Sequence, residues 1–270
     1  MGKKQKTMNG FTIVELLTVI AIIAILIGVL IPSMNLVRNT ARETKQKSQF
    51  ATIDQALLAF RSDYGDYPPS DNDDGDYCGA QKLAEALLGW DLLGFQPSSQ
   101  ANGWRPNFIA AGHINHGGVY DPDYLDERKG PYLELATANA FKLIDLFNPS
   151  TPLAPDTFVL CDSFGVKQVS IGGKAVKAGT PILYYKANTA SKTIKIGDTK
   201  NRIYDYYDNA DIIYLNDMAV KLDEDFFYSD GFIIDPRVTA RPWPYRADSY
   251  ILISAGIDGL YGTSDDICNF

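Results

Sequence analysis

The sequence contains few of the residues from which catalytic and metal sites are usually built. Its 270 residues include only two histidines and three cysteines, and the motifs CxxC, HExxH and GxSxG are all absent. A zinc site of the usual ligand spacing and a metalloprotease or serine hydrolase site are therefore unsupported. The segment at Gly173 and Lys174 lacks the leading glycine and the serine or threonine of a phosphate-binding loop. Scattered carboxylates leave glycosidase chemistry open, but no pair stands out, so we expect that the chain is not an enzyme.

The three cysteines, Cys78, Cys161 and Cys268, lie far apart in the sequence. One disulfide with one free thiol and three reduced thiols are both compatible with this spacing. The cysteine content therefore does not identify the redox compartment of the protein.

The N-terminus differs in charge from the rest of the chain. The first ten residues contain three lysines and no acid, whereas the chain as a whole has a formal net charge of −8, so the remaining residues carry −11. A body this acidic disfavours non-specific binding to nucleic acid. It does suit binding of hard cations such as calcium.

A long apolar run follows the basic N-terminal stretch. Residues 11–31 contain a single charged residue, Glu15. As a helix the run would be about 32 Å long, which is enough to cross the hydrocarbon core of a bilayer. Because Lys3, Lys4 and Lys6 precede it, the positive-inside rule predicts a cytoplasmic N-terminus and places the rest of the chain outside the inner membrane.

A cleaved secretory signal peptide is the main competing interpretation of this run. Such a peptide would carry small residues at a cleavage site directly after the apolar stretch. Here Ala41 is the nearest candidate, and it lies within a polar, amphipathic pattern rather than after a break. The run is also long for a signal peptide, so we favour an anchor that is retained.

Glu15 is the most informative residue of the apolar run. A carboxylate within a membrane-spanning helix costs several kcal/mol unless it is paired or lies at the interface. Cleavage between Gly10 and Phe11 would create an α-amino group one helical turn from Glu15, and this cation could pair with a carboxylate on its own or a neighbouring helix. The alternative is that Glu15 extends toward the lipid headgroups.

The pattern Gly10-Phe11-Thr12-x-x-Glu15 before an apolar run resembles the type III signal of type IV pilins and type II secretion pseudopilins. The resemblance covers residues 3–32. It implies that a prepilin peptidase cleaves after Gly10 and methylates the new N-terminus of Phe11. It further implies that Glu15 pairs with the N-terminal amine of an adjacent subunit, and that Pro32 kinks the helix. Proline within a helix removes one hydrogen bond and bends the axis, in agreement with that role.

The helical pattern continues beyond the membrane as an amphipathic segment over residues 32–63. Its apolar residues form one stripe at helical spacing, which comprises Phe50, Ile53, Leu57 and Phe60. A glycine and two prolines within residues 65–69 end it. We expect the long helix to cover residues 11–63, and its stripe to pack against the sheet of the outer domain.

Residues 64–270 are expected to form a periplasmic globular domain, so that the fold is α+β with a small antiparallel sheet on the long helix. A short helix is predicted over residues 82–93, and strands over residues 158–164, 180–186 and 248–254. The segments 130–133 (GPYL) and 162–165 (DSFG) resemble segments of major pseudopilins. Residues 187–245 look like a large, loop-rich insertion, which we expect to form a second lobe on the outer surface of a filament.

The C-terminal loop, residues 252–267, is a candidate calcium site. It places three carboxylates, Asp258, Asp265 and Asp266, among glycines that permit tight turns. A solvated turn is the alternative interpretation of this composition. The loop resembles the calcium loop of major pseudopilins, which implies side-chain ligands from the three aspartates and weaker candidates at Ser254 and the carbonyl of Leu252.

The resemblance implies a structural subunit of a periplasmic pseudopilus filament in a type II protein secretion system, held in the bacterial inner membrane by one helix before assembly. Its implied partners are prepilin peptidase, further copies of itself in a helical filament, other pseudopilins, the inner-membrane assembly platform with its ATPase, and inner-membrane lipid. No nucleic-acid partner is expected. The alternative is a type IV pilin for adhesion or DNA uptake, which shares the N-terminal signal and is favoured by the long insertion.

Overall fold

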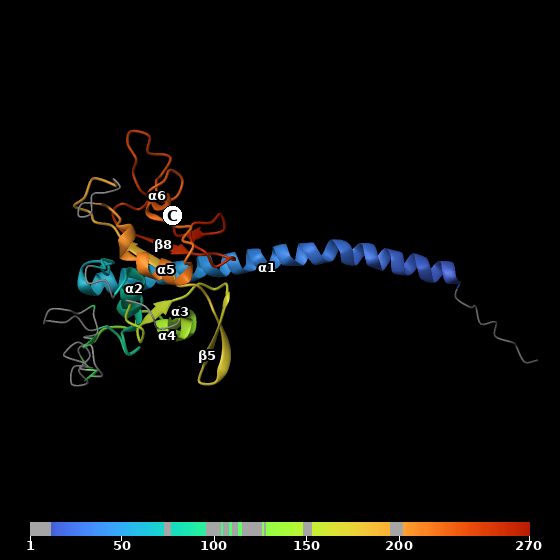
Figure 1. Cartoon of the computed structure of the whole chain (residues 1–270), viewed down its shortest axis with the longest axis horizontal. Coiled ribbons are helices and arrows are strands. Elements are labelled where there is room, and N and C mark those ends of the chain that lie inside the picture. The colour runs from blue at the N-terminus through green and yellow to red at the C-terminus, as the bar shows by residue number, and fades with distance from the viewer. Residues whose placement is uncertain are drawn as a thin grey trace, which may run out of the picture. The chain divides into compact units, whose positions relative to one another are not determined.

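The computed structural model describes residues 12–72, 77–95, 104, 108–109, 113–114, 126, 128–147, 153–194 and 202–270. The chain divides into two units, Met1–Arg42 and Glu43–Phe270. Helix α1 (Ile13–Tyr64) contributes residues to both units. The second unit holds the remaining helices and all the described strands (Figure 1).

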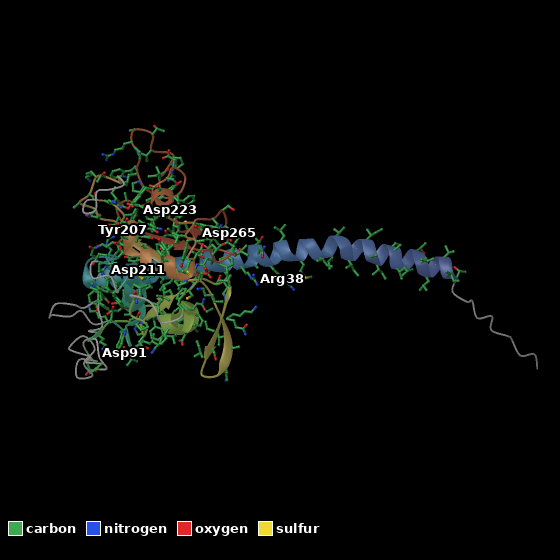
Figure 2. The ribbon with its side chains drawn as sticks, in the orientation of Figure 1. Arg38, Asp91, Tyr207, Asp211, Asp223 and Asp265 are labelled. Carbon is green, nitrogen blue, oxygen red and sulfur yellow. The ribbon has the colours of Figure 1, made fainter. Side chains whose placement is uncertain are left out.

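In the first unit, α1 presents its apolar side chains to the outside. Its N-terminal part is long and apolar enough to cross a membrane, and none of that stretch is buried. Figure 2 shows mostly carbon side chains along this part of the helix up to the labelled Arg38. An exposed apolar surface of this extent needs lipid or other apolar helices around it, so the finding agrees with the membrane anchor predicted from the sequence.

In the second unit, α1 is the spine that the sequence predicts. The four residues of the apolar stripe, Phe50, Ile53, Leu57 and Phe60, are all buried. Three of them share one core cluster with residues of the central sheet, such as Tyr184 and Leu252. The helix ends at Tyr64, one residue after the predicted end. Spacing on one helical face was therefore enough to identify the packed surface of α1.

The strands form small antiparallel sheets, which confirms the predicted α+β fold. The central sheet has the order β7–β8–β9, with Leu183–Lys186, Tyr250–Ser254 and Ile267–Cys268. The other pairs are two-stranded: β1 with β2 (Phe108–Ile109, His113–Ile114), β3 with β4 (Ala140–Lys142, Phe158–Leu160), and β5 with β6 (Lys167–Ile171, Lys174–Ala178). The register of the central sheet pairs Leu183 with Ile253 and Lys186 with Tyr250.

The remaining helices are short. They are α2 (Gly79–Leu88), α3 (Leu135–Ala138), α4 (Leu143–Leu146), the 3-10 turn η2 (Tyr206–Asp208), α5 (Ala210–Asn216) and α6 (Glu224–Phe227). The predicted helix over residues 82–93 is wrong in its bounds. It begins earlier at Gly79, and it ends before Gly89, whose φ of 84° lies in the left-handed region that favours glycine.

The predicted strands exist but are shorter than expected. The prediction over residues 158–164 corresponds to β4, which ends at Leu160, and that over residues 180–186 corresponds to β7, which begins at Leu183. The prediction over residues 248–254 corresponds to β8, which begins at Tyr250. After β4, Cys161 forms an isolated bridge with Pro181, and the carboxylate of Asp162 accepts hydrogen bonds from the backbone N–H groups of Phe164 and Thr180.

The central sheet is buried on both faces. Along β8, Tyr250 and Leu252 lie in the cluster with α1 and α2, whereas Ile251 and Ile253 lie in a second cluster. Successive residues of a strand point to opposite faces, so this alternation assigns one face to each cluster. The sheet is therefore a middle layer of the globular unit, with α1 and α2 on one face.

The second face is covered by residues 187–245, so the expected second lobe is wrong. Buried residues of this segment belong to the same cluster as Tyr185, Ile251 and Ile253, and they include Ile203, Tyr204, Tyr206, Ile212, Ile213, Leu222, Phe227 and Tyr228. The ring of Phe227 lies 4.8 Å from that of Tyr185 between centroids. The described part of the insertion is therefore an integral layer of the core.

Asn209 ties the insertion to the other layers. Its fully buried side chain accepts a hydrogen bond from the backbone N–H of Ala80 in α2 (2.8 Å) and donates one to the carbonyl of Tyr184 in β7 (2.7 Å). Because both the oxygen and the nitrogen of this buried side-chain amide form hydrogen bonds, it fixes the relative position of the three segments. This arrangement explains why the insertion and the sheet form one core.

The neighbouring carboxylate, Asp208, is buried at the same junction. It accepts a hydrogen bond from the hydroxyl of Ser70 (2.5 Å). Burial raises its pKa to about 8, and the Ser70 bond opposes the rise. Asp205 and Asp71 add to the rise in pKa, and Lys82 opposes it. Asp208 is therefore a carboxyl group that retains its proton in the folded state at neutral pH.

Candidate functional site

The two residues of the predicted processing site, Gly10 and Phe11, lie outside the described residues. The described residues begin at Thr12, the second residue after the predicted cleavage site, and α1 begins at Ile13.

Thr12 and Glu15 form a capping box at the start of α1. One carboxylate oxygen of Glu15, Oε2, accepts hydrogen bonds from the backbone N–H of Thr12 (2.9 Å) and from its hydroxyl (2.7 Å). The hydroxyl oxygen of Thr12 in turn accepts a hydrogen bond from the N–H of Glu15 (3.3 Å). Threonine followed three residues later by glutamate is the usual sequence pattern of this cap, because each side chain satisfies a donor that the first helical turn leaves unpaired.

The capping box holds the Glu15 carboxylate at the N-terminal end of the apolar helix. Both hydrogen bonds from Thr12 reach Oε2, and within the described residues Oε1 accepts none. The positive end of the helix dipole also favours a carboxylate at this place. Glu15 thus has one carboxylate oxygen available for a further donor, and it follows Phe11 by four residues in the sequence.

Thr12 is a site residue that the sequence reasoning did not single out. Its role is visible in the spacing Thr12-x-x-Glu15, which is the pattern of a capping box.

Pro32, the predicted kink residue, lies within α1, whose helical backbone continues to Tyr64. The helix therefore accommodates the proline without ending there. A bend at Pro32 remains a prediction.

In the C-terminal loop, Asp265 is held by the loop itself. Its Oδ2 accepts hydrogen bonds from the backbone N–H groups of Ile257 (2.6 Å) and Asp258 (2.9 Å), and its Oδ1 accepts one from the hydroxyl of Thr263 (2.6 Å). Burial acts to raise the pKa of Asp265, but these hydrogen bonds outweigh it and lower the pKa below its usual range. Figure 2 labels Asp265 on the loop that follows β8.

The pKa of the adjacent residue, Asp266, is shifted in the opposite direction. Its Oδ2 accepts a hydrogen bond from the N–H of Gly262 (2.8 Å), whereas its buried Oδ1 has no hydrogen-bond partner within the described part of the chain. Burial raises its pKa to about 7, and the charges of Asp265 and Asp258 add to that rise. A buried carboxylate oxygen without a donor is an atom that a cation could satisfy.

The other three candidate ligands are engaged elsewhere. Asp258 is exposed and accepts a hydrogen bond from the N–H of Leu260 (2.8 Å). The hydroxyl of Ser254 donates to Oδ2 of Asp162 (3.2 Å), and the carbonyl of Leu252 accepts from the N–H of Asn269 (3.3 Å). Asn269 was not predicted as part of this region.

The structure therefore gathers Asp258, Asp265 and Asp266 on one loop without converging them. No group of three His, Cys, Asp or Glu side chains among the described residues is placed to hold a metal ion. The free oxygen of Asp266 fits a cation, whereas both oxygens of Asp265 serve as hydrogen-bond acceptors inside the loop. Calcium binding would require these two aspartates to share their oxygens between the loop and the ion.

The three cysteines are free thiols, and Cys78 and Cys161 are buried. Burial raises the pKa of Cys78 and of Cys268 to about 12, so both thiols stay protonated at neutral pH.

Comparison with known proteins identifies the N-terminal region. Residues 5–31 match the family model of the prokaryotic N-terminal methylation motif. Type II secretion system core protein G from Escherichia coli (strain K12) is 27% identical over 115 residues, which cover 42% of this chain and 77% of that protein. No solved structure matches the chain. The matched motif contains the predicted processing site and Glu15.

Proposed function

We propose that this pseudopilin-like chain, which carries the N-terminal methylation motif, is a structural subunit of a periplasmic pseudopilus filament in a type II protein secretion system. The observation that supports the proposal is the match of residues 5–31 to the N-terminal methylation motif, which includes the start of an exposed apolar helix. The similarity to core protein G supports secretion as the setting. The proposed role is structural rather than catalytic.

Processing is the first proposed step. Prepilin peptidase cleaves the bond between Gly10 and Phe11, releases the basic leader and methylates the new amine of Phe11. Before cleavage, Lys3, Lys4 and Lys6 hold the N-terminus on the cytoplasmic side of the inner membrane, and the globular unit lies in the periplasm. Removal of the leader removes these charges and leaves one cation, the amine of Phe11, at the start of the helix.

Assembly is the second proposed step, and Glu15 directs it. The apolar helices leave the lipid and pack against one another, which keeps their apolar side chains out of water. In that environment an unpaired carboxylate is costly, so the Glu15 carboxylate of one subunit pairs with the Phe11 amine of an adjacent subunit. The capping box supports this role because Thr12 occupies one oxygen of Glu15 and leaves the other for the amine.

The proposed partners follow from these two steps. Prepilin peptidase acts on the leader, inner-membrane lipid surrounds the helix before assembly, and other copies of the chain together with other pseudopilins form the filament. The inner-membrane assembly platform and its ATPase would supply the work of extracting the helix from the lipid. Nucleic acid is not a proposed partner, since the chain has a formal net charge of −8.

Calcium binding by the loop over residues 252–267 is also part of the proposal. The support is the grouping of Asp258, Asp265 and Asp266 and the unpartnered buried oxygen of Asp266. Bound calcium would supply positive charge to this crowded set of carboxylates and so stabilise the fold of the loop.

Filament formation by Glu15 variants tests the central step. Glu15→Leu and Glu15→Gln should insert into the membrane and be processed, but should form few or no filaments, because the amine of the adjacent subunit loses its partner. Thr18→Val is a matched control: Thr18 lies in the same apolar run, and its hydroxyl donates only to the carbonyl of Glu15 (2.9 Å). The control should assemble as the parent does. Filaments of Glu15→Leu in normal amounts would refute the proposed pairing.

A further inference from the structure

The hairpin of β5 and β6 is a two-stranded sheet that makes no strand pairing with the other described strands. Residues Lys167–Ile171 pair with Lys174–Ala178, and the turn consists of Gly172 and Gly173. Figure 1 shows this hairpin standing out from the body of the globular unit. Both outer edges of the hairpin carry unpaired backbone groups, which is the usual place at which another chain adds to a sheet.

The two faces of the hairpin differ in chemistry. Residues that pair directly across an antiparallel ladder lie on the same face, and the face alternates along each strand. One face therefore carries the pairs Lys167 with Ala178, Val169 with Val176 and Ile171 with Lys174. The opposite face carries Gln168, Ser170, Ala175 and Lys177. The hairpin is thus amphipathic, with an apolar face and a polar face.

The body of the protein covers only the base of the apolar face. Val169 and Ala178, at the base, are buried in the core cluster of the insertion. Val176, which pairs with Val169 across the ladder, is 37% exposed, and Ile171, nearer the turn, is 42% exposed. The same face therefore continues from the core toward solvent, where these two aliphatic side chains are partly exposed.

The exposed part of the hairpin is basic. Lys174 and Lys177 are both exposed, and neither forms an ion pair with another described residue. Residues 166–178 contain no acid, although the whole chain has a formal net charge of −8. The hairpin is a positive element on an acidic protein.

A complementary surface occurs in the insertion of the same chain. Besides the buried Asp208, residues 205–225 include one lysine and six acidic residues, Asp205, Asp211, Asp217, Asp223, Glu224 and Asp225. This segment also exposes two large apolar side chains, Tyr214 at 59% and Met218 at 92%. Figure 2 labels Asp211 and Asp223 on this part of the globular unit. The lysines of the hairpin are suited to contact these acidic groups, and its aliphatic side chains are suited to contact the apolar ones.

We propose that the β5–β6 hairpin of one subunit docks on the acidic surface over residues 205–225 of a second copy of this chain. Pairing of two hairpins with each other is disfavoured, because both carry the same positive charge. The contact therefore joins different surfaces of the two copies, and such a heterologous contact can repeat along an open helical filament. The inference rests on the proposed filament function, and it adds a second contact outside the packed apolar helices.

Site-specific photo-cross-linking in the full chain tests this docking. A photoreactive amino acid at Ile171, on the apolar face, should cross-link to a peptide from residues 205–225 of a second copy when filaments form. The same label at Ala175, on the polar face, is the matched control and should give a much weaker cross-link. Cross-links to lipid, to a secreted protein or to a second hairpin would overturn the inference.

Paired substitutions provide an independent measurement. Ile171→Ser with Val176→Ser removes the exposed apolar groups, and should raise the concentration needed for filament growth by roughly tenfold. Gln168→Ser with Ala175→Ser, on the opposite face, should leave it unchanged. Thermal unfolding of each variant checks that the fold is intact.

Two different outcomes separate the docking from the filament function. Filaments of the parent chain together with unchanged assembly of the Ile171→Ser and Val176→Ser variant would overturn the docking alone. Absence of filaments from the correctly processed parent chain would overturn the proposed function and with it the docking.

Discussion

Phe227 provides a direct test of whether the insertion is part of the main core. Its side chain is fully buried, and its ring centroid lies 4.8 Å from that of Tyr185 in β7 and 5.0 Å from that of Tyr228. Tyr185 belongs to the central sheet, whereas Phe227 and Tyr228 belong to the insertion. Phe227→Ala would therefore leave a cavity between two layers of the same unit.

The expected cost follows from the size of the lost side chain. Replacing a fully buried phenylalanine by alanine removes about 3–5 kcal/mol, which combines the lost transfer free energy with the unfilled cavity. The free energy of unfolding of a typical domain is only about 5–15 kcal/mol. For a unit of roughly 200 residues, a loss of about 4 kcal/mol lowers the Tm by about 10 °C.

Urea unfolding of a fragment that begins at Ser33 measures this cost. Tryptophan fluorescence and far-UV circular dichroism should report one shared transition in the parent, and the same single transition at lower urea in Phe227→Ala. Phe226→Ala is the control, since Phe226 is 39% exposed and the change should cost less than about 1 kcal/mol. Two separate transitions, of which Phe227→Ala shifts only one, would refute the idea that the insertion and the sheet share one core.

Three further predictions concern carboxylates and the spine helix. Because folding raises the pKa of Asp208 to about 8, the folded state keeps a proton that the unfolded state releases near pH 4, so the free energy of unfolding should fall between about pH 4 and pH 8. In urea unfolding at several pH values, Asp208→Asn should remove this fall, so that the variant gains up to about 5 kcal/mol over the parent at pH 9 and nothing at pH 3. Calcium should raise the Tm of the parent, and the rise should be smaller in Asp258→Asn. Asp265→Asn should lower the Tm in chelator as well, because the Asp265 carboxylate holds the loop through its hydrogen bonds. Equal unfolding curves of the parent with calcium and with chelator would contradict the calcium proposal. Leu57→Ala in the buried stripe of α1 should cost about 2–5 kcal/mol, whereas Leu58→Ala, on the exposed face, should cost less than about 1 kcal/mol, and equal costs would contradict the orientation of the spine.

The features that depend on spacing within one element were predictable from the sequence. The stripe of Phe50, Ile53, Leu57 and Phe60 requires only that the segment is a helix, and all four side chains are buried. The extent of α1 was predicted for the same reason, since an apolar run followed by an amphipathic run keeps one period.

The role of the insertion was not predicted, although the sequence contained a signal. Residues 250–253 and 182–185 are continuously apolar or aromatic rather than alternating with polar residues. Such runs are typical of strands with both faces buried, which requires a second layer over the sheet. The long helix can cover only one face, so the insertion had to cover the other.

The geometry of the candidate sites depends on hydrogen bonds that spacing only partly reveals. The Thr12 and Glu15 capping box follows a local pattern and could have been identified. By contrast, the engagement of Ser254 with Asp162 and of Leu252 with Asn269 joins residues whose proximity depends on the fold. A choice of metal ligands from composition therefore could not give the hydrogen-bond partner of each oxygen, and calcium binding by the loop stays a prediction.

The mass of the N-terminal peptide of the protein purified from its native membrane tests the central claim most directly. The account predicts a chain that begins at Phe11 and carries one additional methyl group on its amine. A mature chain that still contains residues 1–10, or one that begins after the apolar run, would contradict it.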